Sequence, residues 1–282
     1  MKKTVLAIGL VLALSLSVAA ASFEFYGGGS YNTFSPDVLN DVVGEYNDYL
    51  DDLKAEIVDL DLTGDPAVEN KAEKDLTKVD KFESGFGAFG GLRYWINPST
   101  ALGGEVEYFS KKNEGSLEFS KWSSLEADSE FTNASGSVDV SMDVSVTGFS
   151  GSGAFKASPE LTVFASAGYY YLNGSEEIKV AVDAFDETAP ATKDLILARL
   201  SVPGKAEFSD SALGFKAGAA FSYPVADELS ILGRAAFRSL NFKDVEYDKD
   251  SDWTVWPVTG DATKADLDFS GFELGLGIVY SF

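Results

Sequence analysis

The chain has 282 residues, with 45 Asp or Glu against 22 Lys or Arg, and a formal net charge of −23. It has no Cys and no His, which excludes disulfides, thiolate or His-ligated metal sites and the Ser-His and Cys-His relays of hydrolases. The acidity argues against a nucleic-acid partner, because phosphate binding needs clustered Lys and Arg.

The chain begins with the pattern of an export signal. Lys2 and Lys3 precede an uncharged apolar run over residues 5–18, and small residues follow at 19–21. This pattern predicts a signal peptide over residues 1–21 that is cleaved before Ser22. An uncleaved membrane anchor is the alternative, but the run is short for a hydrocarbon core of about 30 Å. We expect residues 22–282 to form a single domain.

Eight segments then alternate between apolar and polar residues with the period of a β-strand. They cover 22–33, 82–95, 100–109, 145–156, 161–172, 211–223, 229–242 and 267–282. A Gly-Phe pair opens a glycine-dotted run on every second segment. The pairs lie at 85–86, 148–149, 214–215 and 271–272.

Short and long connections alternate along the chain. Short turns with Pro, Asn or Asp lie at 96–99, 157–160 and 224–228, and long polar segments lie at 34–81, 110–144, 173–210 and 243–266. This alternation predicts an all-β fold, a closed up-and-down antiparallel transmembrane barrel of eight strands with long, acidic external loops. Ile178, Val180 and Val182 suggest a hairpin in one loop, so a ten-stranded barrel is the alternative.

The outward face of the barrel is predicted from parity. On the last strand, the apolar positions at 272, 274, 276, 278, 280 and 282 share one face, which we expect to meet lipid. Aromatic residues should form a girdle at each membrane interface. They are Tyr94, Phe155, Phe221 and Tyr223 near the short turns, and Tyr108, Tyr169 and Phe272 near the loops. Apolar parity is even over 138–146 and odd over 149–155, which predicts a β-bulge near 147–148.

The opposite parity carries charges that would face the lumen. The cations are Arg93, Lys156, Lys216, Arg234 and Arg238, and the anions are Glu24, Glu105, Glu107 and Glu273. Because buried unpaired charges cost several kcal/mol each, we expect these side chains to pair and to plug the narrow interior. Arg93 should lie diagonally from Glu105. Lys156 and Glu24 could instead reach water at a rim.

Two features stand out in the loops. Ser35 can cap a helix with Pro36 at its first position, and apolar residues recur at helical spacing, which predicts an amphipathic helix over 36–59. Its apolar stripe either covers the barrel mouth or meets an external partner. In the last loop, Asp248, Asp250 and Asp252 are weak candidates for a calcium site, and a solvated acidic strand extension is the alternative.

The signal, the eight segments, the lumen charges and the C-terminal strand together resemble the small outer-membrane β-barrel families, OmpA-, OmpX- and OmpW-like. The resemblance implies that Ile278, Tyr280 and Phe282 act as the recognition signal for the barrel assembly machinery. It also implies outer-membrane lipid as the environment. We expect a monomer without a cofactor, in a structural or surface-interaction role.

Three other functions remain open at this point. A small-solute channel is the main alternative, since a barrel can conduct if its lumen is open. An enzyme is disfavoured, because the outer-membrane enzymes it would resemble use an essential His, which this chain lacks. A soluble secreted β protein is the last. The sequence identifies no external partner.

Overall fold

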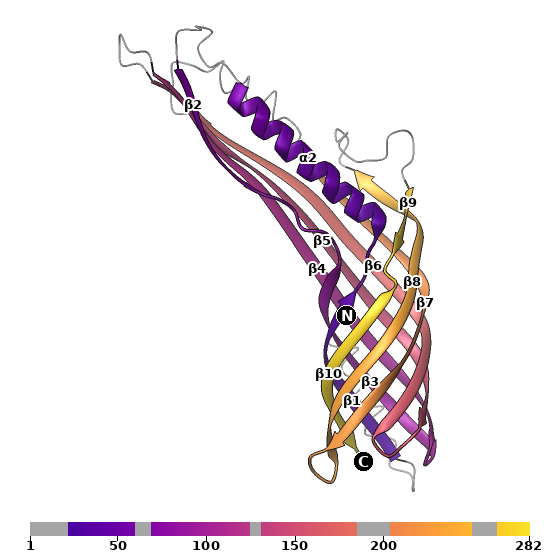
Figure 1. Cartoon of the computed structure of the whole chain (residues 1–282). Helices are drawn as coiled ribbons and strands as arrows, with labels where there is room; N and C mark the ends of the chain where they lie inside the picture. Colours follow the sequence, from indigo (N-terminus) through magenta and orange to yellow (C-terminus); the bar gives the residue numbers. More distant parts are fainter. Residues whose placement is uncertain (1–21, 60–68, 125–130, 185–203, 250–263) are drawn as a thin grey trace.

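The computed structural model describes residues 22–59, 69–124, 131–184, 204–249 and 264–282. The expected signal peptide therefore lies outside the described residues. Between them, ten strands and one helix form an antiparallel barrel with a long extension at one end (Figure 1).

Eight strands close the barrel. They are β1 (Ser22–Thr33), β3 (Ser84–Asn97), β4 (Thr100–Ser124), β5 (Phe131–Lys156), β6 (Leu161–Ala184), β7 (Gly204–Pro224), β8 (Leu229–Lys249) and β10 (Gly271–Ser281). Each pairs antiparallel with the next, and β10 closes the ring by pairing with both β8 and β1. The predicted eight-stranded up-and-down barrel is confirmed. The two further strands do not join the ring: β2 (Glu69–Thr77) pairs with β4, and β9 (Lys264–Asp268) pairs with β8.

Many residues predicted as long loops continue the strands instead, at 110–124, 131–144, 173–184, 204–210 and 243–249. Strands β4, β5 and β6 have 25, 26 and 24 residues, more than twice the roughly 9–11 that a membrane crossing needs. Their outer halves leave the barrel together as one inclined sheet, with β2 near its far end (Figure 1). The short turns and the C-terminus lie at the opposite end of the barrel (Figure 1).

Helix α2 (Asp37–Asp59) lies along this extension (Figure 1). It begins one residue later than predicted, with a first backbone bond from Asn40 N to Pro36 O of 3.0 Å. Its apolar stripe packs on the inner face of the sheet. The buried stripe residues are Leu39, Val42, Val43, Tyr46, Leu50 and Leu53. Of the two predicted roles for this stripe, the structure therefore supports covering the mouth and neighbouring strands.

Two helix amides attach α2 to the chain that returns to β3. Asn40 exchanges hydrogen bonds with the backbone of Phe82, at 2.7 and 3.3 Å, and Asn47 does the same with Val79, at 2.8 and 3.0 Å. The backbone of this irregular segment is thereby satisfied without a further strand. In the part of the chain described, α2 is not apolar enough to cross a membrane as a helix.

The predicted bulge near 147–148 is wrong. Strand β5 pairs with β4 and β6 without a register shift through this region. Even positions face inward from Gly136 to Lys156, so Val140 and Met142 are buried in the same core as α2, while Phe149 and Phe155 point outward from the barrel. The apolar residues of β5 therefore change from the inner to the outer face along the strand. In the extension the inner face packs in the core with the helix, whereas in the barrel the outer face is the apolar one.

The Gly-Phe pairs mark the top of the barrel on alternate strands. In each pair the Phe points outward and the Gly inward. A Cβ on Gly148 would lie 2.5 Å from the Tyr170 ring, and one on Gly214 would lie 2.6 Å from it. Both contacts are closer than real Cβ atoms allow, so these glycines leave the space in which Tyr170 fits.

Candidate functional site

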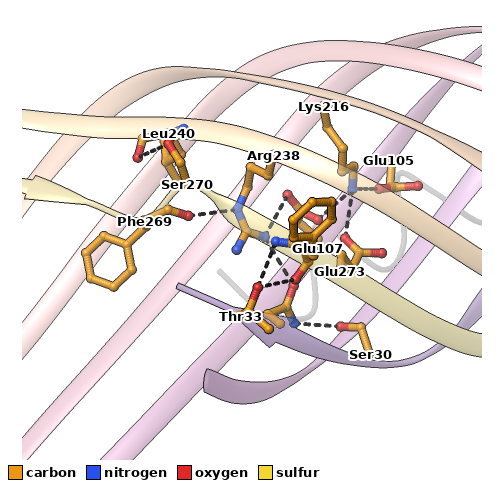
Figure 2. A network of polar contacts seen from close by, with 12 residues as sticks. Ser30, Thr33, Glu105, Glu107, Lys216, Arg238, Leu240, Phe269, Ser270 and Glu273 are labelled. Atoms are coloured by element: carbon orange, nitrogen blue, oxygen red, sulfur yellow. Dashed lines mark hydrogen bonds and ion pairs between the residues drawn. The ribbon is translucent and has the colours of Figure 1, made fainter. Parts of the chain in front are cut away.

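A cluster of buried charged side chains lies in the lumen of the barrel. At its centre, Lys216 on β7 contacts three carboxylates (Figure 2). Its Nζ contacts Glu105, lies 2.6 Å from Glu107 Oε2 and lies 3.3 Å from Glu273 Oε2. The Lys216 side chain is 0% exposed, and the carboxylates are almost as deeply buried. In such a low-dielectric position the charges are stable only because they neutralise one another.

Arg234 on β8 extends the cluster across the full lumen. Its Nη1 donates to Glu105 Oε2 at 2.7 Å, and its Nε contacts the Glu273 carboxylate. Since β4 and β8 are four places apart in the ring of eight, the bond to Glu105 joins opposite walls. The guanidinium lies 3.3 Å from the centre of the Phe89 ring, which covers one of its faces.

Arg238 forms the upper layer and is 0% exposed. Its Nη1 donates to Asn32 Oδ1 at 3.2 Å and lies 3.9 Å from Glu107 Oε1, while its Nε donates to the Phe269 carbonyl at 3.4 Å (Figure 2). Its guanidinium lies 4.0 Å from the centre of the Phe109 ring. This residue therefore joins the charged layer to an aromatic layer above it.

That aromatic layer consists of Phe34, Phe109, Phe242 and Phe269, all buried. Phe269 is in ring contact with each of the other three, at centroid distances of 5.5 Å to Phe34, 6.3 Å to Phe109 and 5.9 Å to Phe242. These rings belong to the same apolar core as helix α2. The charged lumen is thus covered by a packed apolar cluster on the side of the extension.

The lower lumen, near the short turns, contains the remaining charges. Lys156 Nζ lies 3.4 Å from Glu24 Oε1 and 3.9 Å from the centre of the Trp95 ring. The Lys156 side chain is 31% exposed, as expected for a residue at the rim. Arg93 lies directly across from Gly103, which makes Glu105 its diagonal neighbour as predicted. The Glu105 carboxylate is nevertheless engaged by Lys216, Arg234 and Tyr26.

Sequence reasoning missed the polar neighbours of the charges. The Tyr26 hydroxyl donates to Glu105 Oε2 at 2.9 Å, and Asn32 accepts from Arg238. Both residues have the same inward parity as Glu24 on β1. The alternation of this strand could therefore have predicted that their side chains face the lumen. The aromatic cluster could not be predicted from the sequence in this way, because Phe109 and Phe242 are simply the last residues of two predicted strands.

The outward face carries the predicted aromatic residues and the C-terminal residues. All seven girdle residues and Ile278, Tyr280 and Phe282 are exposed, as are Leu274 and Leu276, whereas Glu273 between them is buried. Polar side chains take over the outward positions directly above this band. They are Ser110, Ser145, Asn173, Ser211 and Ser239. On each of β4–β8, the outward positions therefore change from apolar to polar towards the extension.

Comparison with known proteins found similarity to solved structures. No family model and no curated protein matches the chain. Among solved structures, the outer membrane protein OprG from Pseudomonas aeruginosa is 10% identical, covering 93% of this chain and 96% of its own, with a TM-score of 0.41. Ail, the attachment invasion locus protein of Yersinia pestis, is 11% identical, covering 94% and 100%, also with a TM-score of 0.41.

The outer membrane protease OmpT from Escherichia coli is 8% identical, covering 95% and 100%, with a TM-score of 0.29. Two of these three, OprG and OmpT, are outer-membrane proteins by name. Identities and TM-scores this low transfer no ligand and no activity to this chain.

The weak calcium candidates lie at the edge of what the structure describes. Asp250 and Asp252 fall outside the described residues, as does the side chain of Asp248. Among the side chains that are described, no three Asp or Glu come together as metal ligands would.

One buried carboxylate lies outside the lumen. Glu176 on β6 is 1% exposed beneath helix α2, where its Oε2 accepts from the Tyr46 hydroxyl at 3.0 Å. Its Oε1 accepts no hydrogen bond from the residues that the structure describes. Burial raises the pKa of Glu176 to about 8, although the bond from Tyr46 acts in the opposite direction. The carboxyl is therefore protonated at neutral pH, which lets it remain in an apolar interface.

Proposed function

We propose that this chain is an integral outer-membrane barrel that closes its own lumen and has a structural or surface-interaction role. The observation that carries the proposal is the contact of Lys216 with three carboxylates at zero exposure, combined with a bond from Arg234 to the opposite wall. Side chains alone span the bore at this level. The aromatic cluster above them adds a second, apolar layer.

The membrane setting is supported by the outward band. A soluble protein would not expose a continuous belt of large apolar side chains, because each such patch promotes association in water. Here the belt includes Phe86, Leu213, Phe215, Leu276 and Phe282, and polar residues replace it on β4–β8 towards the extension. A cleaved signal over residues 1–21 would deliver the chain there, and the last strand would be read by the assembly machinery. Cell fractionation tests this: the protein should appear in detergent-extracted envelopes and not in the aqueous supernatant.

The proposal includes a monomeric state and no catalytic function, the latter supported by the lack of His in the sequence. The closed ring leaves no unpaired strand edge at the level of the barrel, so no second copy is needed to complete it. The outer face of the extension alternates serine with charged residues such as Asp139, Asp143, Glu177 and Lys179, and it is the surface that an external partner would meet.

Planar-bilayer conductance distinguishes this proposal from a small-solute channel. We expect the purified protein to give no steady conductance. The variant Lys216→Ala with Arg234→Ala removes the two side chains that span the bore, but the phenylalanine layer above them remains, so we expect this variant to stay closed as well. A stable large conductance from the unmodified protein would overturn the sealed lumen and favour the channel.

A further inference from the structure

The nine charged side chains on the inner wall do not pair completely. Lys216, Arg234 and Arg238 contact Glu105, Glu107 and Glu273, and Lys156 contacts Glu24. Five cations and four carboxylates leave one cation over. That cation is Arg93, which forms no ion pair with any carboxylate in the described residues, although it is only 4% exposed.

The nearest carboxylate is already engaged. Glu24 lies directly across from Arg93 in the pairing of β1 with β3, but its carboxylate is turned to Lys156, 3.4 Å away. Aromatic rings cover the Arg93 guanidinium, whose Cζ lies 4.3 Å from the centre of the Tyr26 ring and 5.9 Å from that of Phe164. Such rings attract a cation over their faces but do not accept the N–H groups that point out in the guanidinium plane.

Arg93 is joined by other buried groups that lack a partner. Its own Nε, Trp95 Nε1, Ser152 Oγ and Ser166 Oγ are all buried and make no hydrogen bond in the described chain. Arginine and tryptophan side chains can only donate, and a serine hydroxyl can donate as well. The missing partner must therefore accept hydrogen bonds, and it must compensate a positive charge.

These donors are neighbours across the sheet. Arg93 pairs with Gly103, Gly103 with Ser152, and Ser152 with Ser166, so they form one inward row over β3, β4, β5 and β6. Gly103 brings them close together because it has no side chain: a Cβ there would lie 2.3 Å from the Leu92 carbonyl oxygen, 3.1 Å from Ser152 Oγ and 3.2 Å from Arg93 Cγ. Trp95 is the next inward residue on β3, towards the rim where Lys156 meets solvent.

From this arrangement we propose that the lower lumen binds one small inorganic anion, of the size of chloride, against Arg93 and the hydroxyls of Ser152 and Ser166. A bore of eight strands has little space beyond its side chains, which favours a monatomic anion over a phosphate ester. The anion brings the inner wall to neutrality and enters from the short-turn end. Arg93, Ser152 and Ser166 form none of the ion pairs above them, although Ser166 lies across from Lys216 on the neighbouring strand, so the conductance experiment does not decide this site.

Bromide diffraction tests the site on the unmodified mature protein. Crystals grown or soaked in sodium bromide should show an anomalous peak in hydrogen-bond contact with the Arg93 guanidinium. Ordered water alone at this position, with bromide peaks only on the outer surface, would overturn the proposal. Because no variant is needed, the result does not depend on whether a substitution at Arg93 folds.

Thermal unfolding in detergent gives the same test in solution. At equal ionic strength, chloride should raise the unfolding midpoint by about 2–4 °C over gluconate, which is too large to enter, and the effect should saturate. Arg93→Met should abolish this difference and Arg93→Lys should keep it. Lys243→Met, which removes an exposed cation from β8, is the matched control and should also keep it. Equal midpoints in both salts, or an unchanged chloride effect in Arg93→Met, would refute the site.

Discussion

Replacing Lys216 by Met tests the electrostatic balance of the upper lumen. Three cations there face three carboxylates, and the substitution leaves two against three. Glu105 and Glu273 keep Arg234, whereas Glu107 keeps only Arg238 at 3.9 Å. Since removing one partner of a buried ion pair costs about 3–5 kcal/mol, we expect Lys216→Met to lower the free energy of unfolding by that amount.

A second substitution should restore part of this loss. Glu107→Gln added to Lys216→Met returns the cluster to two cations against two carboxylates, so the double variant should be more stable than the sum of the single losses predicts. Urea unfolding in lipid vesicles, followed by tryptophan fluorescence, measures all three. Lys179→Met is the control, because its Nζ lies 2.8 Å from Glu177 on the surface and its loss should cost under about 1 kcal/mol. A Lys216→Met loss as small as this control, or strict additivity in the double variant, would refute the reasoning.

Three further predictions concern the extension and the barrel surface. The pKa of Glu176 is about 8 in the folded protein and has its ordinary value of 4.5 in the unfolded chain. The free energy of docking of α2 should therefore weaken by about 1.4 kcal/mol per pH unit as the pH rises from 4.5 to about 8. Hydrogen exchange on α2 should show this slope, and Glu176→Gln should remove it. Leu276→Arg, in the middle of the outward band, should cost about 2–4 kcal/mol of unfolding free energy in vesicles, whereas Ser239→Arg above the band should cost little. Gly214→Val should collide with the Tyr170 ring and cost about 1–3 kcal/mol, seen as a lower temperature of the heat-induced gel shift, and Tyr170→Ala in the same chain should relieve it.

The barrel could be predicted because its evidence is local. Alternation with period two gives the strands and their faces, and the order of short and long connections gives their up-and-down arrangement. The helix over 36–59 could be predicted for the same reason, since its apolar spacing and its start at Ser35–Pro36 lie within one segment. None of these inferences needs to know which strands touch across the bore.

The pairing inside the lumen could not be predicted, because it depends on contacts between strands far apart in the sequence. Parity places Glu105 and Arg234 on the inner wall, but only the closed ring brings β4 opposite β8. Cross-strand counting over one hairpin placed Arg93 opposite Gly103 and diagonal to Glu105, as the register shows, but it could not say which cations bind that carboxylate. Lys216, 111 residues away, and Arg234, 129 residues away, reach that carboxylate.

The extension was missed for a different physical reason. Alternation identifies which face of a strand is apolar, but it does not say whether lipid or protein covers that face. On β5 the even positions from Val138 to Val146 pack under α2, while the odd positions from Phe149 to Phe155 face outward from the barrel. When the apolar residues of a strand move from even to odd positions without a β-bulge, the strand therefore passes from a protein core on one face to an apolar environment on the other.

This change of face along β5 also bears on how the lumen is closed. Because the inner face of β5 becomes apolar immediately above Gly148, the charged layer ends where the core of α2 and the phenylalanine cluster begins. Water entering from the extension would have to pass Phe109 and Phe269 before reaching Arg238, whose guanidinium already lies against Phe109 and hydrogen-bonds to the Phe269 backbone. The ion pairs are thus shielded from above by the same residues that dock the helix, and loosening α2 should expose them. For that reason the Glu176 and Lys216 predictions are coupled: raising the pH should weaken the cover over Arg238 before it affects the strands of the barrel.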